Sequence, residues 1–501
     1  MGTINGSTNR HAFSHLAVIS AMALVSGCSL APDYVRPDVN APAAFKETPA
    51  MGSAITGDWK IAQPSDQIAR GQWWTVFQDP VLDRLEQTAL DANQNLKAAT
   101  ARVKEARAIL QTTRADLFPT IGAGFGPSRE KVSPTSLFEP DGVNVPAQTV
   151  WRAQGTASYE TDLFGRVSDS VKASQAESEQ SEALLRSVQL ALQADVAQNY
   201  FSERELDAEL DVYMQTVSLR EQTLKLAQSR FDAGQVSELD VATAKAELAT
   251  ARSDGMTVRR LRAASEHSLA ILLGEAPAQF SMASSPLVPV RVHIPPGVPS
   301  SLLERRPDVA AAERAMEAAN ARIGVAKAAY FPSLSITGSA GFEAATLGDL
   351  FNWSSRAFLL GPLAGTALTL PIFDGGRRKG NLANARAVLE ENAANYRQQV
   401  LIAFREVEDN LSDLRILEEQ TGTQEQAVTA SSRSAELARA QYKEGAITYL
   451  DVIDADRTVL QSRRSAVQLY GVQAISTVNL IRALGGGWGD APLISSTISA
   501  R

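Results

Sequence analysis

Two carboxylates and one guanidinium could act together in the last fifth of the chain. Asp451 and Asp454 lie three residues apart at the predicted start of a helix, so their side chains share one face of that helix. Arg457 follows three residues later and is the local candidate for an ion pair with Asp454. Carboxylates grouped in this way attract cations, and they repel one another when they are crowded.

Helix capping is an alternative explanation for some of these acids. Ser237-x-x-Asp240 and Thr448-x-x-Asp451 have the spacing of capping boxes, and an acid at that place stabilises any helix by about 0.3–1 kcal/mol. Helix capping could therefore explain, at least in part, why acids stand at Asp240 and Asp451. Asp454 lies one turn further into the helix, beyond the cap, and is the stronger candidate for a functional role.

The only cysteine, Cys28, closes a segment that is typical of an export signal. Arg10 supplies positive charge, residues 16–25 form an apolar core, and small residues follow. The sequence Val25-Ser26-Gly27-Cys28 resembles a bacterial lipobox, in which the cysteine becomes the lipid-bearing first residue of the mature chain. Ser29, rather than an aspartate, follows the cysteine, which favours sorting to the outer membrane. An ordinary leader with an incidental cysteine is the alternative.

The composition argues against several other functions. The 501 residues include 48 basic and 56 acidic side chains, and a net charge of −8 does not suit a nucleic-acid binder. One cysteine excludes an intrachain disulfide, and four scattered histidines do not suggest a metal site. There is no G-x-S-x-G, H-E-x-x-H or P-loop motif, so we expect neither an enzyme nor a cofactor. No apolar run reaches the roughly 18–20 residues of a transmembrane helix.

The mature chain consists of two copies of one unit, offset by about 211 residues. Phe231 to Val241 (FDAGQVSELDV) matches Tyr442 to Val452 (YKEGAITYLDV), and Ala115 to Ile121 (ADLFPTI) matches Ala328 to Leu334 (AAYFPSL). The predicted organisation is a signal peptide (1–27), an extended, lipid-anchored N-terminal tether (28–79), a first repeat (80–275), a linker (276–302), a second repeat (303–485) and a C-terminal tail (486–501).

Each repeat is expected to contain the same series of elements. A helix (about 80–117 and 303–330) ends at Phe-Pro because proline cannot continue it. Alternating segments then predict a strand (120–126 and 334–342), a loop (132–147 and 346–357) and a return strand (159–164 and 363–373). A proline-free helix of roughly 100 Å (166–231 and 377–442) follows, then a Gly-centred turn and a return helix (about 239–272 and 450–484).

The strands need neighbours from other copies of the chain. Strands of about ten residues suit a tilted crossing of a bilayer, but four of them would leave unpaired edges in lipid. Three chains would supply twelve strands, an even number within the range of membrane barrels. We therefore predict a mainly α protein with a membrane β-barrel portion, which is a 12-stranded trimeric barrel with four strands per protomer. Long coiled-coil-like helices, with Leu206, Leu210 and Tyr213 at heptad spacing, would form an α-barrel that continues it.

Several motifs occur in order along the mature chain. They are Leu303 to Val309 (LERRPDV), Ala321 to Ala326 (ARIGVA), Tyr330 to Gly338 (YFPSLSITG) and Leu484 to Trp488 (LGGGW). Together they resemble the signature of outer-membrane efflux lipoproteins of the OprM and nodulation-protein-T type, within the TolC superfamily. The resemblance implies a homotrimeric channel in outer-membrane lipid that extends into the periplasm. It also implies a periplasmic adaptor (a membrane fusion protein) and an inner-membrane transporter, most often of the resistance-nodulation-division (RND) class.

By the same resemblance, the repeated turns lie at the periplasmic end, where the channel narrows to a gate. The residues implied are Asp240, Tyr442, Leu450, Asp451, Asp454 and Arg457. Three-fold symmetry would place six carboxylates from Asp451 and Asp454 around one axis, with Leu450 as a plug. For Tyr442, a place in the helical core is an equally good interpretation.

The two turns also match the family's adaptor-contact tips. The residues concerned are Gly234, Val236, Val241, Gly445, Ile447 and Val452. The alternative is that each glycine simply ends a helix. Efflux of small molecules is favoured by the lipobox and by the motif Arg305 to Asp308. Two other functions stay open, a duct for type I protein secretion and a periplasmic coiled-coil scaffold without a pore.

Overall fold

The computed structural model describes residues 29–39, 41–42, 44–47, 72–133, 144–289, 305–360 and 368–486. Cys28, Trp488 and most of the predicted tether lie outside these residues. The chain forms two compact units: unit 1 is Met1–Pro37, Val103–Ser181 and Ala312–Tyr396, and unit 2 is Asp38–Arg102, Glu182–Ala311 and Arg397–Arg501. Each unit contains parts of both sequence repeats, so the compact units do not coincide with the repeats.

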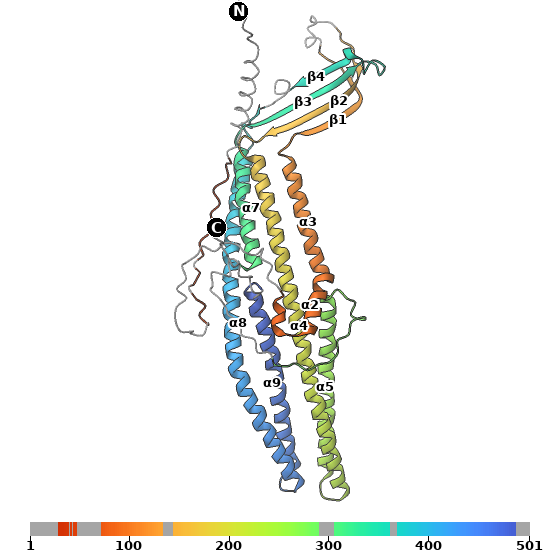
Figure 1. Ribbon diagram of the computed structural model, residues 1–501, viewed down its shortest axis with the longest axis vertical. Coiled ribbons are helices and arrows are strands. Elements are labelled where there is room, and N and C mark those ends of the chain that lie inside the picture. Colours follow the sequence, from red (N-terminus) through yellow and green to blue (C-terminus); the bar gives the residue numbers. More distant parts are fainter. Residues whose placement is uncertain are drawn as a thin grey trace, which may run out of the picture. The chain divides into compact units, whose positions relative to one another are not determined.

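An antiparallel sheet belongs to unit 1 (Figure 1). The strands β1 (Thr120–Glu130), β2 (Gln148–Thr161), β3 (Ser333–Ala344) and β4 (Arg356–Leu360) follow one another across it, and the short β5 (Leu368–Thr369) pairs with β3. The first strand of each repeat is confirmed. The predicted return strand 159–164 covers only the end of β2, and β4 begins inside the predicted loop 346–357, after the short helix η3 (Trp353–Ser355). Small residues in β2, such as Ala153 and Gly155, obscured its alternation.

The sheet has one apolar and one polar face, which follow from its register. One row of directly opposite residues on the apolar face consists of Phe125, Ala153 and Phe342. The adjacent row, on the polar face, consists of Gly126, Arg152 and Glu343. Arg152 also forms ion pairs with Glu130 and Glu343, with N–O distances of 2.9 Å in both. Strands that separate lipid from water alternate in this way.

The long helices match the predicted ranges closely. α4 (Arg166–Asp232) and α8 (Arg377–Lys443) have 67 residues each, and the return helices α5 (Glu238–Leu272) and α9 (Tyr449–Ala483) have 35 residues each. The equal lengths confirm the duplication. The helix α7 (Pro307–Ala328) opens the second repeat. Among the described helices, none combines the length and the apolar character needed to cross a membrane.

The first predicted helix, 80–117, is in fact two helices, α2 (Pro80–Ala92) and α3 (Gln94–Ala115). Asn93 separates them because its side chain accepts a hydrogen bond from the N–H of Leu96 and donates one to the carbonyl of Leu272. The second contact joins residues that are far apart in the sequence, so local periodicity could not reveal it.

The predicted tether has no helix or strand over residues 29–39, but residues 73–77 form the short helix η1, contrary to the expectation of an extended segment, and the described parts are docked on the protein. In unit 1, the Ser29 hydroxyl donates to Asp169 at 2.7 Å, and the Asn320 amide donates to the carbonyl of Pro32 at 2.7 Å. A Cβ at position 324 would overlap the Asp169 carboxylate, so Gly324 permits this close packing. In unit 2, Phe45 joins the largest apolar core, which surrounds the short helix η1 (Trp73–Phe77).

Candidate functional site

Both predicted turns lie in unit 2, and each ends a long helix in the same way. Gly234 follows α4 with φ of 72°, and Gly445 follows α8 with φ of 76°. In each turn, the N–H after the glycine donates to a carbonyl of the last helical turn, at 2.8 and 2.9 Å. This combination is the Schellman motif, which needs a residue that tolerates the left-handed conformation. The glycines therefore end the helices, and nothing lies within 4 Å of a Cβ built on either of them.

The return helices α5 and α9 begin with the two predicted capping boxes. The Asp240 carboxylate accepts hydrogen bonds from the N–H and the hydroxyl of Ser237, both at 3.1 Å. The Asp451 carboxylate accepts them from the N–H and the hydroxyl of Thr448, at 2.9 and 2.7 Å. These bonds lower the pKa of Asp451, so its carboxylate is ionised at neutral pH. Capping positions both acids without burying Asp451.

An apolar cluster beneath the turns joins the hairpins α4–α5 and α8–α9. It consists of Ala227, Val241, Ala244, Tyr442, Tyr449, Val452 and Ile453. Val241 and Val452, two of the predicted adaptor contacts, are 4% and 1% exposed, so their side chains pack inside this cluster. Their side chains lie on the buried face of each return helix, one residue after the capping acid. Val236 and Ile447 are only half-buried.

Tyr442 lies in this core, the place that one of its two interpretations expects. Its ring is 5% exposed, and its hydroxyl has no hydrogen-bond partner among the described residues. Arg230 of α4 lies over that ring, with its guanidinium carbon 4.7 Å from the ring centre. The same guanidinium donates to the carbonyls of Tyr442 and Lys443, at 3.1 and 2.8 Å. A cation at the last carbonyls of a helix is favourable, so Arg230 fastens the end of α8 to α4.

Three of the predicted gate residues project from the first turns of α9. Leu450 is 62% exposed, and the carboxylates of Asp451 and Asp454 are exposed beside it. The first repeat has the capping acid but not the second one, because Thr243 stands at the position that matches Asp454. Across the described residues, no three His, Cys, Asp or Glu side chains are grouped so that they could hold a metal ion.

Arg457 pairs with the predicted Asp454 and, more closely, with a second acid. Its Nη2 lies 2.5 Å from Glu247 of α5, whereas its Nη1 lies 3.9 Å from Asp454. Glu247 also pairs with Arg220 of α4, at 3.0 Å. Asp454 is therefore a secondary partner, because the shorter contact to the more shielded Glu247 includes a hydrogen bond. The contacts connect the start of α9 with α5 and α4.

The residues that fasten α9 and α8 were missed because they lie outside the repeated turns. Glu247 and Arg230 stand at positions matched by Thr458 and Gln441 in the second repeat. A charge that occurs in only one copy of a duplicated hairpin is the signal that could have found them. Because the matching position of the other repeat carries no charge, such a residue does not serve the helix caps that both repeats share. It can instead form a contact between the two hairpins.

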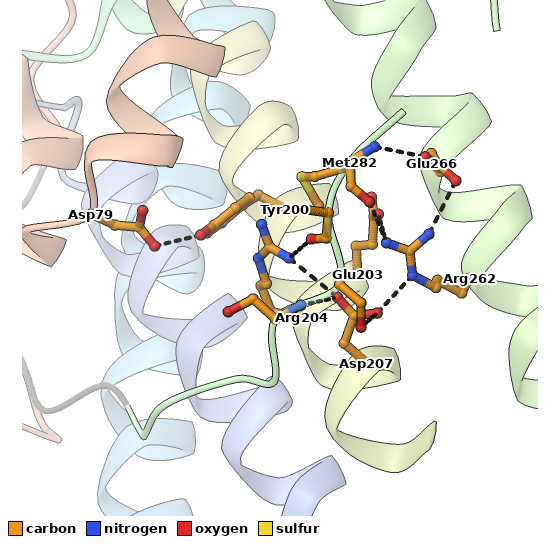
Figure 2. A network of polar contacts seen from close by, with 11 residues as sticks. Asp79, Tyr200, Glu203, Arg204, Asp207, Arg262, Glu266 and Met282 are labelled. Atoms are coloured by element: carbon orange, nitrogen blue, oxygen red, sulfur yellow. Dashed lines mark hydrogen bonds and ion pairs between the residues drawn. The ribbon is translucent and has the colours of Figure 1, made fainter. Parts of the chain in front are cut away.

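A second polar network of unit 2, also missed, holds the segment that follows α5 (Figure 2). Arg262 donates to Asp207 at 2.6 Å and to the Met282 carbonyl at 2.7 Å, and it pairs with Glu203 at 3.1 Å. Asp79, which caps α2, accepts a hydrogen bond from the hydroxyl of Tyr200 on α4, at 2.5 Å. Glu203 is fully buried, and burial raises its pKa to about 7. The network holds parts of α2, α4, α5 and the linker together.

Comparison with known proteins identifies the family. The sequence profile of the outer membrane efflux proteins matches residues 85–275 and 298–486. The chain is 33% identical over 466 residues to the probable efflux pump outer membrane protein TtgC of Pseudomonas putida, which covers 93% of this chain and 94% of the relative. It is 32% identical over 475 residues to the cation efflux system protein CusC of Escherichia coli O157:H7, with 93% and 97% covered.

The fold leads to the same family. The solved structure of the outer-membrane channel OprN matches with a TM-score of 0.82 and 30% sequence identity. The match covers 92% of this chain and 100% of the OprN chain. The resemblance seen in the ordered motifs is thus confirmed over both repeats. The chain belongs to the outer membrane efflux protein family and is a channel component for efflux through the outer membrane.

Proposed function

We propose that three copies of this chain form one duct through which small toxic molecules leave the cell. The edge strands of the described sheet, β1 and β4, support the trimer, because lipid cannot satisfy their outer backbone groups. An inner-membrane transporter of the RND class would supply the cargo through a periplasmic adaptor. The relatives are named for an efflux pump and a cation efflux system, which favours efflux over the alternative of protein secretion.

The first turns of α9 form the periplasmic gate in this proposal. The observation that carries it is the exposure of Leu450, Asp451 and Asp454 directly above a packed apolar cluster. Around a three-fold axis, the leucines would exclude water and the six carboxylates would repel one another and attract cations. Arg457, through Glu247, and Arg230 hold the hairpin α8–α9 against α4 and α5 and so oppose that repulsion. Opening consists of releasing these contacts and moving the hairpin outward.

Single-channel recording in planar bilayers tests the gate. Arg457→Gln removes the contact with Glu247 and should raise the open population up to about fivefold, since an ion pair with a largely exposed arginine contributes up to about 1 kcal/mol. Arg252→Gln is the matched control, because it breaks an exposed ion pair with Glu221 between α4 and α5. A variant Arg457→Gln that stays as closed as the parent would refute the role of this contact. Replacing Asp451 and Asp454 together by Asn should lower cation selectivity.

The exposed turns are the surfaces proposed for the adaptor. Gly234 and Gly445 leave open space where a side chain would stand, and Val236 and Ile447 offer half-buried apolar surface beside them. Gly445→Asn adds a side chain that tolerates the φ of 76° at this position, so it should abolish efflux while the trimer still assembles. Ala446→Asn, at the exposed neighbouring position, should retain efflux. If Gly445→Asn prevents assembly instead, the glycine is structural only.

Cys28 is proposed as the lipid-bearing residue that anchors the chain in the outer membrane. The docking of Ser29 and Pro32 on unit 1 supports this, because it places the start of the mature chain at a defined point. Cys28→Ser should abolish incorporation of labelled palmitate. Incorporation that persists in Cys28→Ser would contradict the anchor.

A further inference from the structure

Basic residues lie on the apolar face of the sheet, at the ends of its strands that are farthest from the helices. Arg129 is opposite Thr149, and Arg356 is opposite Phe342, so both arginines share the face of Phe342 and Trp151. Lys131 follows the end of β1 by one residue, and all three side chains are exposed. Cations on the apolar face of a membrane sheet are costly unless they lie at its rim.

These three basic residues differ from Arg152, on the polar face of the sheet, in their lack of ion pairs with described residues. Arg152 binds Glu130 and Glu343, whereas Arg129 and Lys131 form no ion pair with any residue that the structure describes. Arg356 donates one hydrogen bond to the carbonyl of Trp353, at 2.7 Å, and also has no ion pair with a described carboxylate. The outward-facing rim therefore carries positive charge that the described protein does not neutralise.

Exposed aromatic side chains lie next to the basic ones. Arg356 is stacked on the Trp353 ring, 3.2 Å from its centre. Trp353 and Phe358 are 76% and 84% exposed, and Phe125 and Phe351 are also exposed. Aromatic side chains of this kind mark the level of lipid head groups, where one end of a ring meets hydrocarbon and the other meets water. The cations thus stand at the height where head-group phosphates would be.

We propose that Arg129, Lys131 and Arg356 bind the phosphates of phosphorylated glycolipids in the outer leaflet of the outer membrane. This rests on the proposed trimeric duct, which places the loop ends of β1 and β4 on the cell exterior. A phosphorylated lipid supplies both things that the rim lacks, an anion for the guanidinium groups and acyl chains for the exposed aromatic and apolar side chains. Arginine is well suited to this because its planar fork donates two hydrogen bonds to one phosphate.

The experiment measures binding of lipid A to the purified trimer in a non-ionic detergent. Three probes are compared: bisphosphorylated lipid A, the same lipid after enzymatic removal of its phosphates, and inorganic phosphate. The parent should bind the bisphosphorylated lipid most tightly. The triple variant R129Q/K131Q/R356Q should bind it about 100-fold more weakly, because each basic residue near an anionic lipid surface contributes about fivefold.

Two comparisons keep the test decisive. The triple variant K97Q/R102Q/K104Q removes the same charge from exposed positions of α3 and should bind like the parent. Arg129→Gln alone should cost about fivefold, which provides a measurement if the triple variant folds poorly. Equal binding of the dephosphorylated lipid, or unchanged binding by R129Q/K131Q/R356Q, would overturn the proposal. Failure of both the parent and the gate variant Arg457→Gln to conduct ions in planar bilayers would refute the duct instead, and this is measured separately from lipid binding in detergent.

Discussion

Glu86 provides a direct test of how burial controls ionisation in this chain. It lies on α2 with 0% exposure, and neither carboxylate oxygen has a hydrogen-bond partner among the described residues. Burial, together with a smaller effect of the nearby Asp83, raises the pKa of Glu86 from 4.5 to about 9. The folded protein therefore keeps this carboxyl group protonated at neutral pH.

The raised pKa makes the free energy of unfolding depend on pH. The unfolded chain releases the Glu86 proton near pH 4.5, but the folded protein retains it up to about pH 9. Between these values the folded state loses stability as pH rises, by about 1.4 kcal/mol per unit. At pH 7 the accumulated loss is on the order of 3 kcal/mol. Glu86→Gln keeps the shape of the side chain but cannot ionise, so it should remove this loss.

Thermal unfolding followed by circular dichroism measures the effect. The Tm of Glu86→Gln minus that of the parent should increase steadily between about pH 5 and about pH 8. Glu105→Gln is the control, because it makes the same substitution at an exposed position of α3. A difference for Glu86→Gln that is independent of pH would show that the folded protein ionises this group, and would refute the reasoning. The side chain is buried within one protomer, so trimer assembly does not create the effect.

Three further substitutions test other parts of unit 2. Arg306 binds Asp308 and Glu406, both at 2.6 Å, and is 6% exposed, so Arg306→Gln should destabilise the protein by about 3–5 kcal/mol in denaturant titrations. Burial raises the pKa of Glu203 in the folded protein from its ordinary 4.5 to about 7, so the parent should lose stability as pH rises between these two values. Glu203→Gln should remove this loss, which hydrogen exchange measures. Gly274 has φ of 71°, and a Cβ there would lie 2.6 Å from a backbone oxygen of α2, so Gly274→Ala should lower the Tm and the yield of folded protein.

Local patterns were sufficient for the two long helices and for their ends. The ranges of α4 and α8 follow from long proline-free segments, and their ends follow from Gly234 and Gly445, because few other residues adopt the left-handed conformation. The capping boxes at Asp240 and Asp451 span only four residues each, so they too can be recognised in the sequence. The duplicated turns and the ordered motifs were likewise enough to predict the family.

Contacts between distant parts of the chain were decided by the tertiary structure alone. The sequence placed Asp454 beside Arg457, but folding brings Glu247 closer from another helix. Val241 appeared as a tip residue, yet packing against the opposite hairpin buries it. The break at Asn93 likewise depends on a carbonyl of α5. Periodicity reports which face of an element is apolar, whereas the partner of a charge or a buried side chain depends on where the other elements lie.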